Sequence, residues 1–374
     1  MNILHLFSNC KWTGPAEPAL NLCVALRAHG INADFACAPD AGQSINKVVE
    51  TARDRGIEPI LQFHLRKHRH PLRNLQDRWA LSRFLSTHPY DLIHCHLDND
   101  HAIAISAAQK HPIPIVRSSY EGNGFAMSAR HASLLAQTAV VIEPSFLARN
   151  QDSKTFGLSP ERFYVVPGAV DTHRFDPARE VPDGRSWMRI PRDAFVVGIV
   201  ARMQTHRHYT DLFEAFQQLA QYVPDAYLIV VGRGSKQEQV GKQPVRERGL
   251  ERRVLFPGFI EGENYVGMLK AFDVGVFLVP GSDGTCRAAR EIMAMGKPMI
   301  VADRGMLREI VTHEQDGLVF DGSGEQLFLS IKRLCERKSE RIRLGCMARS
   351  TAQTRFSLAV QAQQVAGIYS SILT

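Results

Sequence analysis

The residues from Pro280 to Asp303, PGSDGTCRAAREIMAMGKPMIVAD, place two acidic side chains around a glycine-bearing loop and an expected helix. Asp283 precedes this helix and Glu291 follows eight positions later, so at the rise of an α-helix about 12 Å separate the two residues. The free N–H groups and the dipole at a helix start favour anions. The segment therefore favours a ligand with hydroxyl groups at both ends and an anionic middle, such as a nucleotide diphosphate sugar.

Each of these acids also has a purely structural interpretation. Asp283 has the residue type and position of a helix N-cap, and capping is compatible with binding a sugar. Glu291 could be a surface glutamate that pairs with Arg287 one turn earlier. Such an ion pair would stabilise the helix by only about 0.2–0.5 kcal/mol. The sequence of this segment leaves both interpretations open.

Two arginines follow an apolar run in VGIVARMQTHRHYTDLFEAF. Arg202 leaves the carboxyl end of the expected strand, and Arg207 lies in the turn before the next helix. Ligands of open α/β sheets bind outside these strand ends, where two guanidinium groups can hold a diphosphate through charge-assisted hydrogen bonds. The alternative is that both side chains are merely solvated, but together with the acidic segment they favour a diphosphate ligand.

The first 21 residues, MNILHLFSNCKWTGPAEPALN, predict a strand, a loop with Gly14 and a helix that begins near Pro15 and Pro18. Glycine lets the backbone approach a phosphate or sugar closely, and proline in a first helical turn costs no hydrogen bond. The loop lacks the GxGxxG spacing of the dinucleotide fold, which argues against a nicotinamide or flavin enzyme.

The segment HCHLDNDH contains His94, Cys95, His96, Asp98 and His101, which are all potential metal ligands. On a strand His94 and His96 would share one face while Cys95 points to the other, so we expect a strand end that leads into a cleft and no metal site. The GxSxG motif is absent, and the sequence shows no arrangement of serine, histidine and aspartate typical of a serine hydrolase.

The segment from Phe63 to Trp79, FHLRKHRHPLRNLQDRW, is strongly basic. One interpretation is a solvated loop that enters an amphipathic helix. The other is a peripheral contact with an anionic membrane through Arg66, Lys67 and Arg69, because cations near such a surface contribute about 1 kcal/mol each. Apolar side chains stand beside these cations at Leu72, Leu75 and Trp79.

Short apolar runs alternate with helical patterns throughout the chain, which predicts two doubly wound parallel sheets in tandem. A length of 374 residues also favours two domains. We expect an N-terminal domain over 1–170, a proline-rich linker over 171–192, a C-terminal domain over 193–354, and a final helix over 355–374 whose docking site the sequence does not indicate.

The composition, with 44% hydrophobic and 22% charged residues, is that of an ordinary globular protein. The net charge of +7 favours an anionic substrate, a nucleic acid or an anionic membrane without choosing among them. Seven cysteines without a CxxC pair indicate reduced thiols. Since neither a signal peptide nor a membrane-spanning run is apparent, we expect a cytoplasmic protein.

Three motifs together resemble the retaining glycosyltransferases of GT-B architecture, in the large family four that includes bacterial lipopolysaccharide, phosphatidylinositol mannoside and polysaccharide enzymes. VVPGAVDTHRFDP resembles the family's VVPNGVDTERFxP, and ARMQTHRHYTDLFEAF resembles GRLxPEKGxDLLLEAF. DGTCRAAREIMAMGKPMIVAD resembles the E-x7-E motif EGFGLPxLEAMAxGxPVIA. The resemblance covers nearly the whole chain and implies two Rossmann-like domains that face a cleft, the first for the acceptor and the second for the donor.

The resemblance implies a role for each matching residue. Arg202 and Arg207 would hold the donor diphosphate, Glu291 would bind the ribose hydroxyls, and Asp283 would face the donor sugar. The remaining positions would surround the donor: the backbone amides of Gly284, Thr285 and Cys286 at the sugar or phosphates, Phe259 and Ile260 at the base, and Gly14 near the phosphates.

The chain departs from the family pattern at three positions. Asp283 is one methylene shorter than the usual glutamate, and Arg207 replaces lysine. Tyr120 stands where the family often has a histidine after its fifth strand, and Glu121 follows it. Tyr120 either hydrogen-bonds the sugar in place of that histidine or leaves the role empty.

The resemblance implies transfer of a hexose-type sugar from a UDP- or GDP-linked donor to a glycan or glycolipid acceptor, with retention of configuration. It implies no cofactor, no metal and no nucleic acid, and a place in the cytoplasm or at the inner face of the cytoplasmic membrane. Two alternatives stay open: a nucleotide-sugar epimerase or phosphorylase of the same fold, and a non-catalytic nucleotide-sugar-binding partner.

Overall fold

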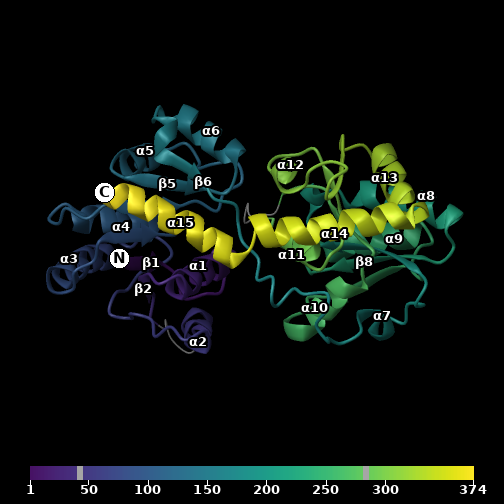
Figure 1. Ribbon diagram of the computed structural model, residues 1–374, viewed down its shortest axis with the longest axis horizontal. Helices are drawn as coiled ribbons and strands as arrows, with labels where there is room; N and C mark the ends of the chain where they lie inside the picture. Colours follow the sequence, from purple (N-terminus) through teal and green to yellow (C-terminus); the bar gives the residue numbers. More distant parts are fainter. Residues whose placement is uncertain (40–44, 281–285) are drawn as a thin grey trace. The chain divides into compact units, whose positions relative to one another are not determined.

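The computed structural model describes residues 1–39, 45–280 and 286–374, which form two compact units (Figure 1). The first unit comprises Met1–Gly168 and Leu358–Thr374. The second comprises the described residues of Ala169–Ser282 and Cys286–Ser357. The chain thus returns to the first unit after completing the second.

The first unit is built on a parallel six-stranded sheet with the order β2-β1-β3-β4-β5-β6. Its strands are β1 (Asn2–Phe7), β2 (Asn32–Cys37), β3 (Leu92–Cys95), β4 (Ile115–Ser118), β5 (Val140–Glu143) and β6 (Phe163–Val165). Side chains of β1 alternate between two cores, with Ile3 and Phe7 on one face and Leu4 and Leu6 on the other. Both faces of the sheet are therefore buried.

Helices cover both faces of this first sheet. The helices are α1 (Ala16–Ala28), α2 (Lys47–Asp54), α3 (Pro71–Thr87), α4 (Asp98–Ala108), α5 (Ala129–Ala136), α6 (Phe146–Phe156) and α15 (Leu358–Leu373). The final helix α15 packs beside α1 in Figure 1, and its Val365 and Tyr369 join the core that holds Ile3 and Phe7. This answers where the C-terminal helix docks.

The second unit repeats the architecture with the strand order β12-β11-β10-β7-β8-β9. Its strands are β7 (Phe195–Val200), β8 (Ala226–Val231), β9 (Val254–Gly258), β10 (Val274–Phe277), β11 (Met299–Ala302) and β12 (Gly317–Phe320). Its helices are α7 (Gly184–Trp187), α8 (Tyr209–Tyr222), α9 (Gln243–Glu247), α10 (Gly262–Ala271), α11 (Arg287–Ala294), α12 (Leu307–Ile310), α13 (Gly324–Glu336) and α14 (Lys338–Arg355). Two separate apolar cores fill its two faces.

Residues 171–192, expected as a linker, pack against the second unit. Phe175 and Ile190 are buried in one of its cores because apolar side chains stand between the prolines of this segment. Arg349 of α14 donates hydrogen bonds to the carbonyl of Phe175 at 2.6 Å and to the Asp176 carboxylate at 2.8 Å. These contacts hold the segment in place.

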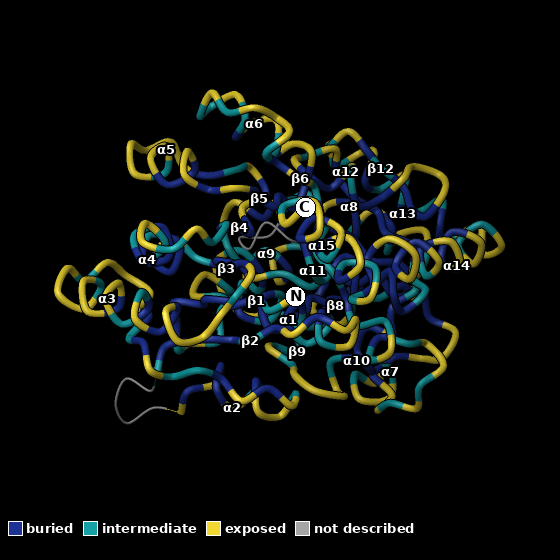
Figure 2. Tube along the Cα trace, turned by 60° about the vertical axis from the view of Figure 1, so that its left-hand side comes forward, coloured by how far each residue is buried: buried dark blue, intermediate teal, exposed yellow. Residues whose placement is uncertain are grey.

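The predicted fold class is confirmed, since both sheets are parallel and helices cover both faces of each. Figure 2 shows the consequence, with buried strands inside a shell of more exposed helices and loops. Within the described residues, every helix is too short or too polar to cross a bilayer.

Candidate functional site

Two glycines fit the loop after β8 tightly against the loop after β7. Gly232 has a φ of 132°, and a Cβ atom added to it would lie 2.3 Å from the Ala201 carbonyl oxygen. At Gly234 an added Cβ would lie 2.2 Å from the carbonyl oxygen of Met203. Only glycine permits this backbone approach at the carboxyl edge of the second sheet. The sequence analysis missed this pair, although two glycines directly after an apolar strand were a usable signal.

Arg207 ends a short 3₁₀ turn after β7, and its side chain is only 4% exposed. Its Nη1 donates to the carbonyl oxygens of Val279 at 3.3 Å and Pro280 at 2.9 Å. The guanidinium therefore ties the turn to the segment after β10, while its charge stays at the sheet edge. Arg202 is exposed beside it in the same loop, and no ion pair of its side chain is found in the part of the chain that the structure describes.

Glu291 lies in α11 and is buried, with 6% of its surface exposed. Its Oε2 accepts a hydrogen bond from the Tyr265 hydroxyl at 2.5 Å, and its Oε1 lies 3.3 Å from Nε of Arg287. The ion pair with Arg287 that the sequence suggested is present, but the glutamate is not a surface residue. Its carboxylate is held between two donors.

Tyr265 of α10 is the partner that the sequence analysis missed. Burial, and next the negative charge of Glu291, raise the pKa of the Tyr265 hydroxyl well above its ordinary value. The phenol therefore keeps its proton and donates a hydrogen bond to the carboxylate. Tyr265 and Glu291 are 26 positions apart, so no local pattern joins them.

Cys286 precedes α11 in the left-handed conformation, with a φ of 47°, and its side chain is buried. A non-glycine residue in this conformation stores strain, which is typical of ligand-binding loops. Asp283, Gly284 and Thr285, the other predicted residues of this loop, lie outside the described residues.

Phe259 follows β9 and exposes 56% of its surface, whereas Ile260 packs against the core of the second unit. The guanidinium carbon of Arg233 lies 4.9 Å from the centre of the Phe259 ring. An exposed aromatic face beside a cation can stack on a base and attract a phosphate. Arg233 is a further residue that the sequence analysis missed.

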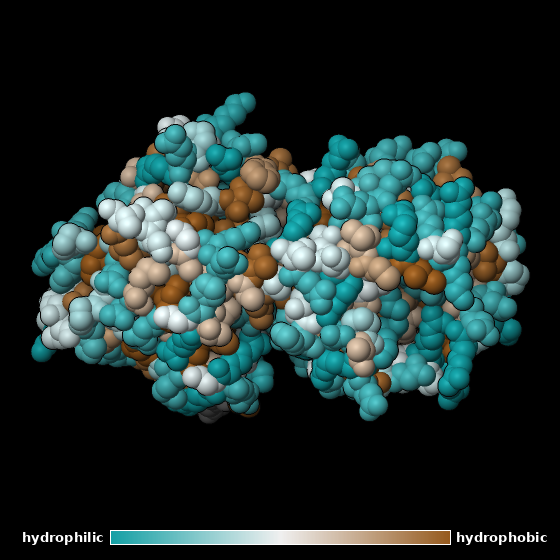
Figure 3. All heavy atoms as spheres, viewed as in Figure 1, coloured by the Kyte–Doolittle hydropathy of each residue, from teal (hydrophilic) through white to brown (hydrophobic). Residues whose placement is uncertain are grey.

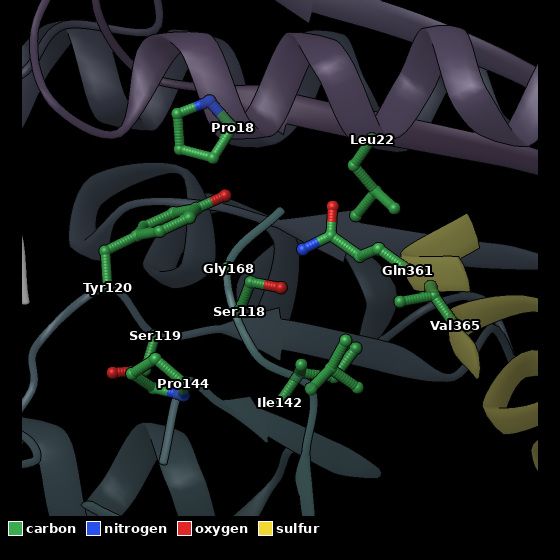
Figure 4. A pocket seen from close by; sticks show the side chains of 11 residues that line it. Pro18, Leu22, Ser118, Ser119, Tyr120, Ile142, Pro144, Gly168, Gln361 and Val365 are labelled. Atoms are coloured by element: carbon green, nitrogen blue, oxygen red, sulfur yellow. The ribbon is translucent and has the colours of Figure 1, made fainter. Parts of the chain in front are cut away.

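In the first unit, Tyr120 follows β4 and lines a cavity of about 30 Å³, which has room for a water molecule but not for a sugar. Figure 4 shows its ring on one side of this cavity and the Gln361 amide of α15 on the other. The Tyr120 hydroxyl lies 2.7 Å from Nδ1 of His96. Gly14 also belongs to this unit, in the turn before α1.

Three buried histidines lie close together in the first unit: His5 of β1, His94 of β3 and His96 directly after β3, with ring centroids 4.5 to 5.2 Å apart. His94 contacts the hydroxyls of Tyr369 at 2.5 Å and Ser118 at 2.7 Å. Nδ1 of His5 lies 2.9 Å from Nε2 of His96.

The histidine nitrogens are close enough together to hold a metal ion, since they lie within 4.8 Å of one another. Most of them are instead engaged in hydrogen bonds. Burial lowers the pKa of His5 to about 3 and those of His94 and His96 well below their ordinary value, so the rings are neutral. The arrangement is a buried polar network that connects β1, β3, β4 and α15.

Comparison with known proteins finds two family models in this chain. Residues 13–174 match the model described as Glycosyltransferase Family 4, and residues 185–351 match the model described as Glycosyl transferases group 1. The two matches correspond closely to the two structural units.

Among curated relatives, the lipopolysaccharide core biosynthesis glycosyltransferase LpsD of Rhizobium meliloti is 33% identical over 186 residues, which cover 49% of this chain and 52% of LpsD. A D-inositol 3-phosphate glycosyltransferase of Corynebacterium urealyticum is 25% identical, over 76% of this chain and 72% of the relative. The chain thus matches only about half the length of some relatives, such as 48% of mannosylfructose-phosphate synthase of Agrobacterium fabrum.

Solved structures share the whole fold. A glycosyltransferase from Rickettsia africae superposes with a TM-score of 0.84 at 16% identity and covers 100% of this chain and 98% of its own. HepE of Anabaena in complex with UDP gives 0.79 at 21% identity, over 99% of this chain and 100% of its own. Both likenesses concern the fold alone.

Proposed function

Since the chain belongs to the glycosyltransferases that the family 4 and group 1 models describe, and has the GT-B fold, we propose that it transfers a hexose from a nucleotide diphosphate sugar to an acceptor hydroxyl in cell-envelope glycan synthesis. The observation that carries this proposal is the buried Glu291 carboxylate, fixed by Tyr265 at the carboxyl edge of a doubly wound sheet. Ligands of such sheets bind at this edge.

Glu291 is suited to accept hydrogen bonds from the two hydroxyls of a ribose. One carboxylate can accept about four hydrogen bonds, from protein donors and ligand hydroxyls together. Because Tyr265 and Arg287 fix its orientation, the carboxylate loses little freedom when the ligand binds. A glutamate on an exposed helix face would have no such constraint.

The cations of this edge divide into two roles. Arg202 is exposed and is the better placed to contact the donor diphosphate directly. Arg207 is already bonded to the carbonyls of Val279 and Pro280, so it shapes the loop and contributes charge. Negative charge grows on the diphosphate as it leaves, and cations fixed in advance stabilise that charge.

The exposed ring of Phe259, with Arg233 beside it, is suited to the base of the nucleotide. The HepE structure contains UDP, which favours a UDP-linked donor, while a GDP-linked donor remains the second choice. We assign Tyr120 to the acceptor side of the reaction, in the first unit. Attack by the acceptor from the face that the diphosphate leaves would retain the anomeric configuration and needs no protein nucleophile.

The experiment is an assay of wild type and Glu291→Gln with UDP- and GDP-sugars, combined with thermal shift, because a bound donor raises the melting temperature. We expect one donor to stabilise the wild type and to release its nucleotide diphosphate when an acceptor is added. Glu291→Gln should lose most of this binding. The control Glu251→Gln changes an exposed glutamate in the turn before β9 and should not.

The products separate the alternatives. Net transfer with nucleotide release, and an unchanged anomeric configuration by NMR, supports a retaining transferase. Epimerised donor or a sugar phosphate product would indicate the epimerase or phosphorylase. Donor binding without turnover of any acceptor would indicate a binding partner of another enzyme.

A further inference from the structure

The amino edge of the second sheet gathers cations around one carboxylate. Asp273 precedes β10, and its Oδ2 accepts hydrogen bonds from Nη2 of Arg185 and from the backbone N–H of Val196, both at 2.8 Å. Its Oδ1 lies 3.8 Å from Nη2 of Arg341. The three charged side chains are partly buried, with exposed fractions of 16% to 21%. One carboxylate therefore serves two guanidinium groups.

Lys297 is a further cation beside this carboxylate. In the parallel register of β10 and β11, Gly275 pairs with Met299, so Asp273 and Lys297, each two positions earlier, lie level with each other at the strand starts. The Gly275 N–H donates to the Pro298 carbonyl at 3.0 Å and continues the pairing toward them. Among the residues that the structure describes, the Lys297 ammonium nevertheless has neither an ion pair nor a hydrogen bond. Its three donors are therefore uncommitted.

Lys270 adds a fourth positive charge. It lies in the last turn of α10, and its Nζ donates to the carbonyl oxygen of Arg179 at 2.9 Å. Burial is the main reason why the pKa of Lys297 is lowered to about 8. Four neighbouring charges also act on this pKa: Asp273, which raises it, and Arg185, Lys270 and Arg341, which lower it. The four cations are thus close enough to repel one another.

Helix ends account for part of this positive charge. Helices α10, α11 and α13 end at this edge of the sheet. Arg185 donates to the Ala271 carbonyl at the end of α10, at 3.1 Å, and Arg341 donates to the Leu334 carbonyl at the end of α13, at 2.6 Å. Each helix C-terminus is equivalent to about half a negative charge, so with Asp273 the three ends offset about two and a half of the four positive charges. A surplus of about one and a half positive charges is left.

The acids nearest to Arg341 in the sequence are paired with other cations. Glu336 lies 3.3 Å from the Lys332 ammonium, and Glu340 lies 2.5 Å from Nη2 of Arg333. These glutamates therefore do not remove the surplus. Figure 3 shows mainly hydrophilic residues over the part of the second unit where Figure 1 labels α10 and α14, a surface that dissolved ions can reach.

We propose that Lys297 and Arg341, with the exposed Lys270 beside them, form a binding site for a small oxyanion of the phosphate class. The ammonium of Lys297 and Nη2 of Arg341 can both donate charge-assisted hydrogen bonds to such an ion. A phosphate group carries a charge of about −1.5 to −2 at pH 7, which matches the surplus at this edge. A chloride ion or a single carboxylate would neutralise only part of it.

The site goes beyond the proposed function and does not depend on it. Glu291 and Tyr265, the residues assigned to the donor, lie on α11 and α10, whose C-terminal ends lead to Lys297 and Asp273. Both helices therefore separate this amino edge from the carboxyl edge at which the donor is expected. An anion bound here is placed as a regulator and not as a reactant.

The first test is calorimetry of the full chain with inorganic phosphate and with glucose 6-phosphate, the two sources of this chemistry. We expect both ions to bind, and Lys297→Gln to raise both dissociation constants by about tenfold or more, because it removes one charged partner of the ion. Lys154→Gln removes the same charge from an exposed position and should change neither. Arg202→Gln, at the carboxyl edge, should also leave this binding unchanged.

The second test uses sulfate, whose charge does not change between pH 7 and pH 9. Lys297 binds an anion in its protonated form, and its pKa of about 8 lies inside this range. We therefore expect the Kd for sulfate to rise by about tenfold from pH 7 to pH 9 in the wild type. Lys297→Arg keeps its charge throughout and should bind sulfate equally well at both pH values. A purely structural lysine would not produce this difference.

Three results would overturn the proposal. One is that phosphate, glucose 6-phosphate and sulfate all fail to bind, in which case the cations only neutralise helix ends. Another is equal affinity in Lys297→Gln and wild type, and the third is a loss of binding in Arg202→Gln, which would move the ion to the donor edge. Tighter binding of either phosphate compound supports the site and identifies its source. UDP binding to Lys297→Gln tests the proposed function separately, because that variant leaves the donor edge unchanged.

Discussion

The hydroxyl of Tyr120 lies 2.7 Å from Nδ1 of His96, which is fully buried. The resemblance in the sequence predicts a role for Tyr120 in place of a histidine, and this contact fixes the position of its hydroxyl. Nε2 of the same His96 lies 2.9 Å from Nδ1 of His5, so the tyrosine ends a chain of neutral imidazoles. The position is therefore built into the core of the first unit.

Tyr120→Phe tests this relationship. The variant keeps the ring but leaves Nδ1 of His96 without its partner, so we expect the free energy of unfolding to fall by about 1–3 kcal/mol. If the hydroxyl also contacts the acceptor or the sugar, turnover falls at least tenfold, or about 1.4 kcal/mol, while the donor Kd stays unchanged. Urea unfolding and steady-state kinetics measure the two effects. An unchanged stability would show that the hydrogen bond contributes nothing.

The neutral histidines predict a pH dependence of stability. Burial lowers the pKa of His5 to about 3 in the folded state, so below the ordinary value of 6.5 the unfolded chain binds more protons. The contribution of His5 is therefore complete above pH 6.5 and is lost as the pH falls, by about 1.4 kcal/mol per pH unit. His5→Gln should remove this slope. The difference in unfolding free energy between wild type and His5→Gln, measured from pH 7 to 5 on a scale of about 2 kcal/mol, checks the sign.

Tyr265→Phe separates the anchoring of Glu291 from its binding role. Removal of the hydroxyl leaves a buried carboxylate with one donor fewer, and a single lost hydrogen bond to a charged group costs about 1.5–3 kcal/mol. We expect a tenfold or larger rise in the Kd for the donor nucleotide, by calorimetry. Tyr222→Phe, at an exposed tyrosine, is the matched control. Equal donor affinity in Tyr265→Phe and wild type would remove Tyr265 from the site.

The sequence analysis predicted those features that depend on local pattern. Parallel strands are buried on both faces and stand out as short apolar runs, and Arg202 and Arg207 stand in the loop after one of them, β7. Tyr265, Arg233, His5 and Tyr369 were missed because each meets its partner across a sheet or between helices distant in sequence. The packing of α15 against α1 could not be predicted from the sequence for the same reason.

The packing of residues 171–192, the expected linker, could not be predicted for a related physical reason. Prolines in 171–192 correctly indicated irregular backbone, but irregular backbone can still bury side chains such as Phe175 and Ile190. Proline spacing reports the local conformation and not the surface on which a segment packs. The contacts of Arg349, which lies about 170 positions further along the chain, decide that question.

Gly232→Ala tests the tight loop of the second unit. An added Cβ would lie 2.3 Å from a backbone oxygen that cannot move aside easily, and the φ of 132° is unfavourable for alanine. We expect a loss of stability of about 2–4 kcal/mol and weaker donor binding. Gly324→Ala, where nothing lies within 4 Å of the added atom, should leave both unchanged. A tolerated alanine at Gly232 would show that the two loops are free to separate.

Phe259→Ala tests which part of the donor the exposed ring contacts. Stacking of a base on an aromatic side chain contributes about 1–3 kcal/mol, so the Kd for UDP should rise by roughly five- to a hundredfold. Inorganic diphosphate has no base, and its affinity should not change in this variant. Arg233→Ala should weaken both ligands, because the cation beside the ring attracts phosphate as well. Calorimetry with the two ligands therefore distinguishes a base platform from a general anion site. If Phe259→Ala weakens UDP and diphosphate equally, the ring only positions Arg233 and the base binds elsewhere.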